Sequence, residues 1–149
     1  MKKTLNKKIL LPLFLLSLSL FLLSGTSNAA ASFTLSFITF KLQSSASPLL
    51  KATAGTAILT SITISAESLV EISSSLIQMS SDASLTITSS SFSNVNLTTG
   101  SGAVIHAEIG DSKQLSLTGS TTSKNSFTNC HSSSAVGGAI YVSTQSDSS

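Results

Sequence analysis

The chain of 149 residues contains no arginine and no tryptophan, and it has one cysteine and one tyrosine. Without arginine, and with only eight lysines, it has no basic patch to neutralise phosphates, so nucleic-acid binding is not expected. The single cysteine, Cys130, excludes an internal disulfide, so backbone hydrogen bonds and packing must hold the fold. Proline is limited to Pro12 and Pro48, which argues against a disordered, mucin-like stalk.

The N-terminal region has a basic start, an uncharged apolar run from Ile9 to Leu23, and a short polar stretch that ends in small residues. This order is typical of a secretion signal peptide. We predict that it spans residues 1–29 and is cleaved between Ala29 and Ala30, with Ala31 as the second choice. The alternative is an uncleaved anchor, which needs about 18 or more apolar residues, and this run is shorter. The mature chain is therefore expected to be secreted, or to lie at the cell surface or outer membrane.

Removal of the signal changes the charge balance of the chain. Four of the eight lysines lie before residue 9, so the mature part is mildly acidic. Its length of roughly 120 residues suits one small domain. No second apolar run is long enough to cross a bilayer, so contact with a membrane is expected only during export or through a C-terminal anchor outside these residues.

After residue 55, aliphatic residues alternate with serine or threonine over short segments. Such alternation predicts β-strands with one face in a core and one in water. The segment Glu67–Met79 could instead form one amphipathic helix, although Ser73, Ser74 and Ser75 are poor helix formers. The expected strands cover residues 58–64, 69–72, 76–79, 85–88, 115–118 and 140–142.

An internal repeat appears when the chain is shifted by 35 positions. Residues 91–94 then align with 126–129, and residues 102–106 align with 137–141. Residues 85–87 match 115–117 if about five residues near 119–124 are inserted in the second copy, and residues 55–59 are a weaker echo of the glycine segment. A repeat of 20–50 residues predicts a solenoid, and strand-type units predict a β-solenoid with stacked coils.

The repeated residues have a structural interpretation. Phe92 and Phe127 are expected to point inward and stack. Asn94 and Asn129 are expected at turns, where asparagine tolerates left-handed dihedral angles, and they could bond to each other. The glycines are expected to form a sharp corner before a strand whose isoleucines enter the core; these residues are Gly102, Gly137, Gly138, Ile105 and Ile140.

The segment 126–130, followed by a serine-rich spacer and by Gly137–Val142, resembles the repeat of right-handed parallel β-helix proteins. Two groups share these GGAI and F-x-N-C features: the polymorphic membrane proteins of chlamydiae and large β-helix surface proteins of protists. Position 130 is cysteine where the chlamydial pattern has asparagine, which favours the second group. The resemblance implies a pectin-lyase-like right-handed parallel β-helix with an adhesin-like role and a host-surface protein or carbohydrate as partner.

These observations divide the chain into a signal peptide (1–29), an N-terminal segment or cap (30–54) and partial β-helix repeats (55–149). Only a short polar tail follows Val142, which is too small to cover the cross-section of a coil. We therefore expect this chain to be an N-terminal fragment of a longer protein, or to associate end to end.

Few residues are candidates for chemistry. Cys130 and His131 are neighbours in a strand and face opposite sides, so a core thiol and a surface imidazole are expected and a shared metal ion is not. His106 aligns with Tyr141 and is interpreted as a variable strand position. Asn96 lies in the only N-glycosylation sequon. No catalytic, cofactor-binding or metal-binding residue is predicted.

Many parallel β-helices cleave polysaccharides, so an enzyme is the alternative function. Lyases of that kind use arginine or lysine as a base, and glycoside hydrolases need two carboxylates within about 10 Å. Here arginine is missing and the acidic residues are scattered. We therefore expect a non-catalytic, exported scaffold; the alternative is a fragment of a polysaccharide lyase or glycoside hydrolase.

Overall fold

The computed structural model describes residues 32–42 and 48–145, and within them it contains β-strands and no helix. The prediction of all-β structure is therefore confirmed for these residues, and none of them forms a helix that could serve as a membrane span. The strands are β1 (Ser32–Ser36), β2 (Thr39–Lys41), β3 (Leu50–Ala52), β4 (Gly55–Thr60), β5 (Thr63–Ile72), β6 (Ile77–Met79), β7 (Ala83–Thr88), β8 (Ser91–Leu97), β9 (Ile105–Ile109), β10 (Leu115–Thr118), β11 (Ser126–Ser132) and β12 (Ile140–Thr144).

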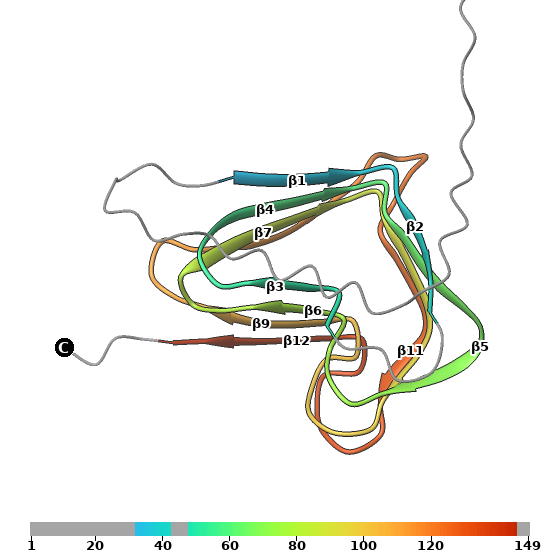
Figure 1. Cartoon of the computed structure of the whole chain (residues 1–149). Helices are drawn as coiled ribbons and strands as arrows, with labels where there is room; N and C mark the ends of the chain where they lie inside the picture. The colour runs from blue at the N-terminus through green and yellow to red at the C-terminus, as the bar shows by residue number, and fades with distance from the viewer. Residues whose placement is uncertain (1–31, 43–47, 146–149) are drawn as a thin grey trace, which may run out of the picture.

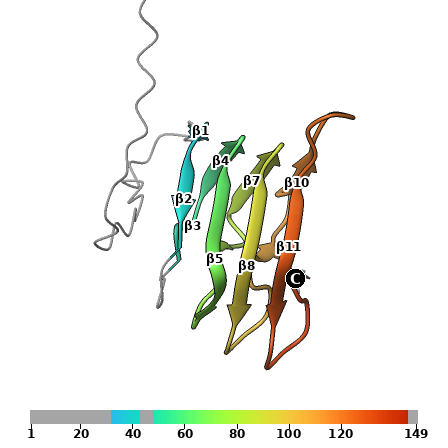
Figure 2. The same ribbon diagram turned by 90° about the vertical axis from the view of Figure 1, so that its right-hand side faces the viewer.

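Each strand pairs in parallel with the strand three places further along the chain, and this pairing gives three four-stranded sheets. Sheet A has the order β1-β4-β7-β10, sheet B the order β2-β5-β8-β11, and sheet C the order β3-β6-β9-β12. Each set of three consecutive strands forms one coil, and the four coils stack around a roughly triangular cross-section (Figure 1). The paired strands lie side by side along the stack (Figure 2). This arrangement is consistent with the β-solenoid that the repeat predicted.

The corner between sheets A and B is made by one left-handed residue in each of the first three coils. Phe37, Ser61 and Ser89 have φ angles of 58°, 53° and 51°. The amide of Phe37 donates to the carbonyl of Thr60, and that of Ser61 donates to Thr88, so hydrogen bonding between coils continues around the bend. The single strand expected over residues 58–64 is therefore wrong, because this corner divides it into the end of β4 and the start of β5.

The core lies inside the coils and is built from the alternating aliphatic side chains. Phe92 is fully buried, and so are the inward residues of β7 and, in β9, Ile105 and Ala107. Residues 67–79 form most of β5 and all of β6, so the alternative of a helix there is wrong. Three serines at residues 73–75, which disfavour a helix, form the connection between those two strands.

The register of the last two coils confirms the 35-residue alignment. Ser91 lies beside Ser126, and Ile105 beside Ile140. In sheet A the offset is only 30, with Leu85 beside Leu115, because the connection from β10 to β11 has the extra residues expected near 119–124. The echo over residues 55–59 is wrong, since these residues form β4 in sheet A and not a strand of sheet C.

The strands begin earlier than the expected boundary at residue 55. Residues 32–52 contain β1, β2 and β3, which pair with the second coil and so form the first coil of the same stack. At the other end, the inward residues of the fourth coil are less covered than those beneath them. Leu117 is 40 % exposed and Val142 is 44 % exposed, whereas their partners Ile87 and Ala107 are 0 % exposed. The expected assembly or continuation at this end stays a prediction.

Candidate binding faces

The two repeated phenylalanines stack inside the coils. Phe92 in β8 and Phe127 in β11 have ring centroids 5.2 Å apart and planes inclined by 8°. Both lie in register with Ile64 of β5 and Phe40 of β2, so one inward column runs through all four coils. These phenylalanines therefore belong to the core, as predicted.

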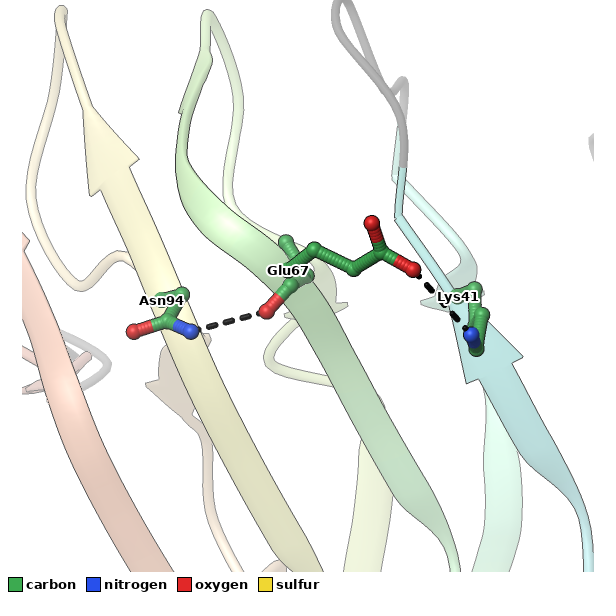
Figure 3. Close-up of polar contacts among 4 residues, drawn as sticks. Lys41, Glu67 and Asn94 are labelled. Atoms are coloured by element: carbon green, nitrogen blue, oxygen red, sulfur yellow. Dashed lines mark hydrogen bonds and ion pairs between the residues drawn. The ribbon is translucent and has the colours of Figure 1, made fainter.

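The repeated asparagines occupy left-handed positions in sheet B. Asn94 has φ 62° and Asn129 has φ 52°, and the Asn129 Nδ2 donates to Asn94 Oδ1 over 3.0 Å. Asn94 Nδ2 in turn donates to the carbonyl oxygen of Ala66 over 2.7 Å (Figure 3). The predicted asparagine ladder is present, and it joins three coils.

Below this ladder, β5 departs from the regular register. Ser65 lies beside Ser93 and Val70 beside Val95, so the four residues 66–69 lie opposite Asn94 alone. The excursion carries Glu67, whose carboxylate lies 3.3 Å from Lys41 Nζ (Figure 3). Both side chains are largely exposed, so this ion pair adds little to stability. An open groove of about 600 Å³ follows the excursion. Alternation alone does not predict this excursion, because a continuous strand and an interrupted one can show the same pattern of residues.

The glycine corner precedes the strands of sheet C. Gly102 has φ +73° and Gly137 has φ +78°, which are conformations that other residues rarely adopt. A Cβ at Gly102 would collide with the Ile105 carbonyl, whereas one at Gly138 would meet nothing within 4 Å. Two of the three glycines therefore form the corner. Ile105 beyond it is fully buried and Ile140 packs against the core, as expected.

Cys130 and His131 point to opposite sides of β11. Cys130 lies beside Val95 and is partly buried, while His131 is exposed and lies beside Asn96. The Cys130 thiol lies 3.3 Å from the Thr128 carbonyl oxygen, to which it donates, and burial raises the pKa of this thiol. It is a core thiol of the last coil.

The sequon residue Asn96 is nearly enclosed. Its side chain is 8 % exposed and lies between Glu71 of β5 and His131 of β11. Its Oδ1 atom has no hydrogen-bond partner among the described residues. Glycosylation at Asn96 stays a prediction, and the folded chain presents little of this side chain to a modifying enzyme.

The outer face of sheet C gathers long polar and aromatic side chains in one column. Lys51, Gln78, His106 and Tyr141 lie in register across β3, β6, β9 and β12. The His106 and Tyr141 rings have centroids 5.0 Å apart and planes inclined by 38°. The alignment of His106 with Tyr141 was predicted from the repeat, but the tilted contact between their rings was not.

Two polar contacts orient His106 within this column. Its Nδ1 donates to the carbonyl oxygen of Ser101 over 3.0 Å, and this bond assigns the tautomer when the ring is neutral. Its Nε2 lies 4.0 Å from a carboxylate oxygen of Glu108, which is two residues along the same face. The imidazole is thus held by a backbone carbonyl of the connection that precedes β9, and its Nε2 faces the Glu108 carboxylate.

Within the part of the chain that the structure describes, no three histidine, cysteine, aspartate or glutamate residues lie close enough to hold a metal ion. No family model, no curated protein and no solved structure matches this chain. The function must therefore be argued from the faces themselves.

Proposed function

We propose that the chain is an exported, non-catalytic β-helix scaffold that acts at the cell surface or after secretion, in an adhesin-like role, with a host-surface protein or carbohydrate as partner. The fold proposed is a right-handed parallel β-helix. Its sense of winding supports this: in Figure 2 the strands of sheet B nearest the viewer point downward while successive coils advance from left to right, which is the course of a right-handed screw.

The observation that carries the binding role is the sheet C column. The chain has a single tyrosine and few charged residues, yet Tyr141, His106 and Lys51 lie on one outer column, with Glu108 beside it. Tyrosine contributes more than its share of binding energy in interfaces because it buries a large, rigid surface and keeps a polar end. A regular sheet also holds these side chains in place before binding, which lowers the cost of ordering them.

Export supports the same role and has its own test. A basic start, an apolar run and a small-residue site precede the mature part. Secreted protein from the native host should begin at Ala30, or at Ser32 if the second site is used. Intact-mass measurement of the exported protein that finds Met1 would remove the surface role.

Binding is tested with labelled mature chain on a glycan array and on intact host cells treated with protease or with glycosidases. Loss of binding after one treatment identifies a protein or a carbohydrate partner. Tyr141→Ala should weaken binding about tenfold or more, because interface tyrosines commonly cost over 1–2 kcal/mol when truncated. Thr60→Ala, on the opposite sheet, is the matched control. Equal binding by the folded Tyr141→Ala variant would reject this face, and polysaccharide cleavage by the chain would favour the enzyme alternative.

A further inference from the structure

The outer face of sheet A differs from the other two faces in composition. Each strand of this sheet presents alternate residues to the outside, and every one of them is serine or threonine except Ile58. The four strands contain no charged residue. Exposed faces of small domains ordinarily carry many charges, which keep them soluble. The outward residues are Ser32, Thr34, Ser36, Thr56, Ile58, Thr60, Ser84, Thr86, Thr88, Ser116 and Thr118.

These side chains form a regular two-dimensional array. All three pairings in sheet A keep their register without a shift, unlike the pairing of β5 with β8 in sheet B. The last outward column aligns Ser36, Thr60, Thr88 and Thr118. Within it the hydroxyl oxygens of Thr88 and Thr118 lie 2.8 Å apart, so this pair is hydrogen-bonded along the column.

The chemistry of this array excludes several kinds of partner. Without charge, the face has no group for an ionic ligand. Its outward positions hold no aromatic ring on which a sugar could stack. What it offers is a lattice of hydroxyl groups, each of which both donates and accepts, with methyl groups of threonine between them. A ligand that matches must itself be a repeating lattice of donors and acceptors.

Ordered water is such a lattice, and its dimensions follow from its hydrogen bonds. Oxygens about 2.75 Å apart in a tetrahedral network place the next-nearest oxygens of ice about 4.5 Å apart, with a repeat of about 7.3 Å along the hexagonal axis. Parallel strands lie about 4.8 Å apart, and alternate residues of one strand are about 6.6 Å apart. Both backbone spacings of the array therefore agree with these two spacings of ice to within about a tenth, and the hydroxyl oxygens of Thr88 and Thr118, 2.8 Å apart, lie at the nearest-neighbour distance.

We propose that the outer face of sheet A binds the surface of ice, with its serine and threonine hydroxyls in the place of lattice oxygens. One hydroxyl contributes little on its own, because liquid water competes for each hydrogen bond. Many hydroxyls fixed on one rigid sheet act together, and each one after the first binds at a high effective concentration. The regular spacing and lack of charge of this array are therefore the properties that suit the face to an ice surface.

The experiment uses the mature chain and measures the gap between melting and freezing temperatures of a single ice crystal, together with the crystal's shape. The wild-type chain should produce a gap and facet the crystal. Thr86→Lys, at the centre of the face, should reduce the gap several-fold, because its long charged side chain holds the array away from the lattice. Ser93→Lys makes the same change in the same coil but on sheet B, and it should leave the gap unchanged. Circular dichroism must show that both variants are folded.

Thr86→Ser keeps the hydroxyl and removes the methyl group, so it gives a second reading if the lysine variant does not fold; it should retain part of the gap. A folded wild-type chain that neither facets ice nor opens a gap overturns the proposal, and so does a Thr86→Lys variant that equals the wild type. Tyr141→Ala separates this proposal from the adhesin role, because it should weaken binding to host surfaces about tenfold or more and leave ice binding intact.

Discussion

The inward phenylalanine column allows a quantitative test of how coils stabilise one another. Phe92 is 0 % exposed and lies between Ile64 of the coil before it and Phe127 of the coil after it. Replacement by alanine removes a full ring from a closed core, which typically costs about 3–5 kcal/mol. Phe127 is only partly buried, because no further coil covers it among the described residues. Phe127→Ala should therefore cost about 1–2 kcal/mol.

The measurement is urea unfolding of the mature chain, followed by circular dichroism, with the slopes compared before midpoints are interpreted. The double variant should reveal a coupling of about 0.5–1.5 kcal/mol for the stacked pair. Phe37→Ala is the matched control: this ring is 82 % exposed at the corner of the first coil, and its loss should change stability by less than about 0.5 kcal/mol. If Phe127→Ala proved as costly as Phe92→Ala, the ordering of burial along the stack would be wrong. A zero coupling would mean that the rings do not stack.

Two further predictions concern the glycine corner and the thiol. Gly102→Ala should strongly destabilise the chain, since its φ is +73° and the new Cβ would collide with backbone, while Gly138→Ala should be nearly neutral; thermal unfolding of the two variants in parallel checks this, and equal losses would contradict the corner. Burial raises the pKa of Cys130, so the folded state favours the neutral thiol; stability is full below the thiol's ordinary pKa and falls as pH rises through the raised value. Cys130→Ser should flatten that alkaline loss in pH-dependent melting curves, and an unchanged pH profile would show that another group is responsible.

The sequence predicted the later coils far better than the first one. The offset between β8 and β11 stays at 35 along both strands. A single shift of the sequence therefore aligns the repeated phenylalanine, asparagine and glycine residues. The first coil is shorter: Ser32 lies beside Thr56, an offset of 24, so no constant shift reveals it. A strand requires only that inward and outward residues alternate. Coils of different length therefore differ in the connections between their strands. For this reason the alternation predicts residues 30–54 as an N-terminal segment or cap and not as part of the first coil.

Local features of the faces were less predictable for a related reason. The corner at Ser61 depends on a left-handed serine, which looks like any other serine in an alternating stretch. The β5 excursion depends on which residues of Ser65–Val70 pair with β8, and that is decided by the neighbouring coil. The contact between the His106 and Tyr141 rings required knowledge of register, which the repeat supplied, and of ring orientation, which it did not.

The stacking of parallel coils also determines how the molecule would respond to mechanical force. Hydrogen bonds between coils run along the stack, so tension applied between its two ends loads them directly, one coil boundary after another. Thr63 and Ser91 mark equivalent points of adjacent coils, 28 residues apart. Releasing one such coil would lengthen the chain by about 100 Å at roughly 3.5 Å per residue. A stack of this kind would unfold in discrete steps, one coil at a time. Asn94 hydrogen-bonds both to Ala66 and to Asn129, so these side-chain bonds must break together with the backbone hydrogen bonds as the last three described coils separate.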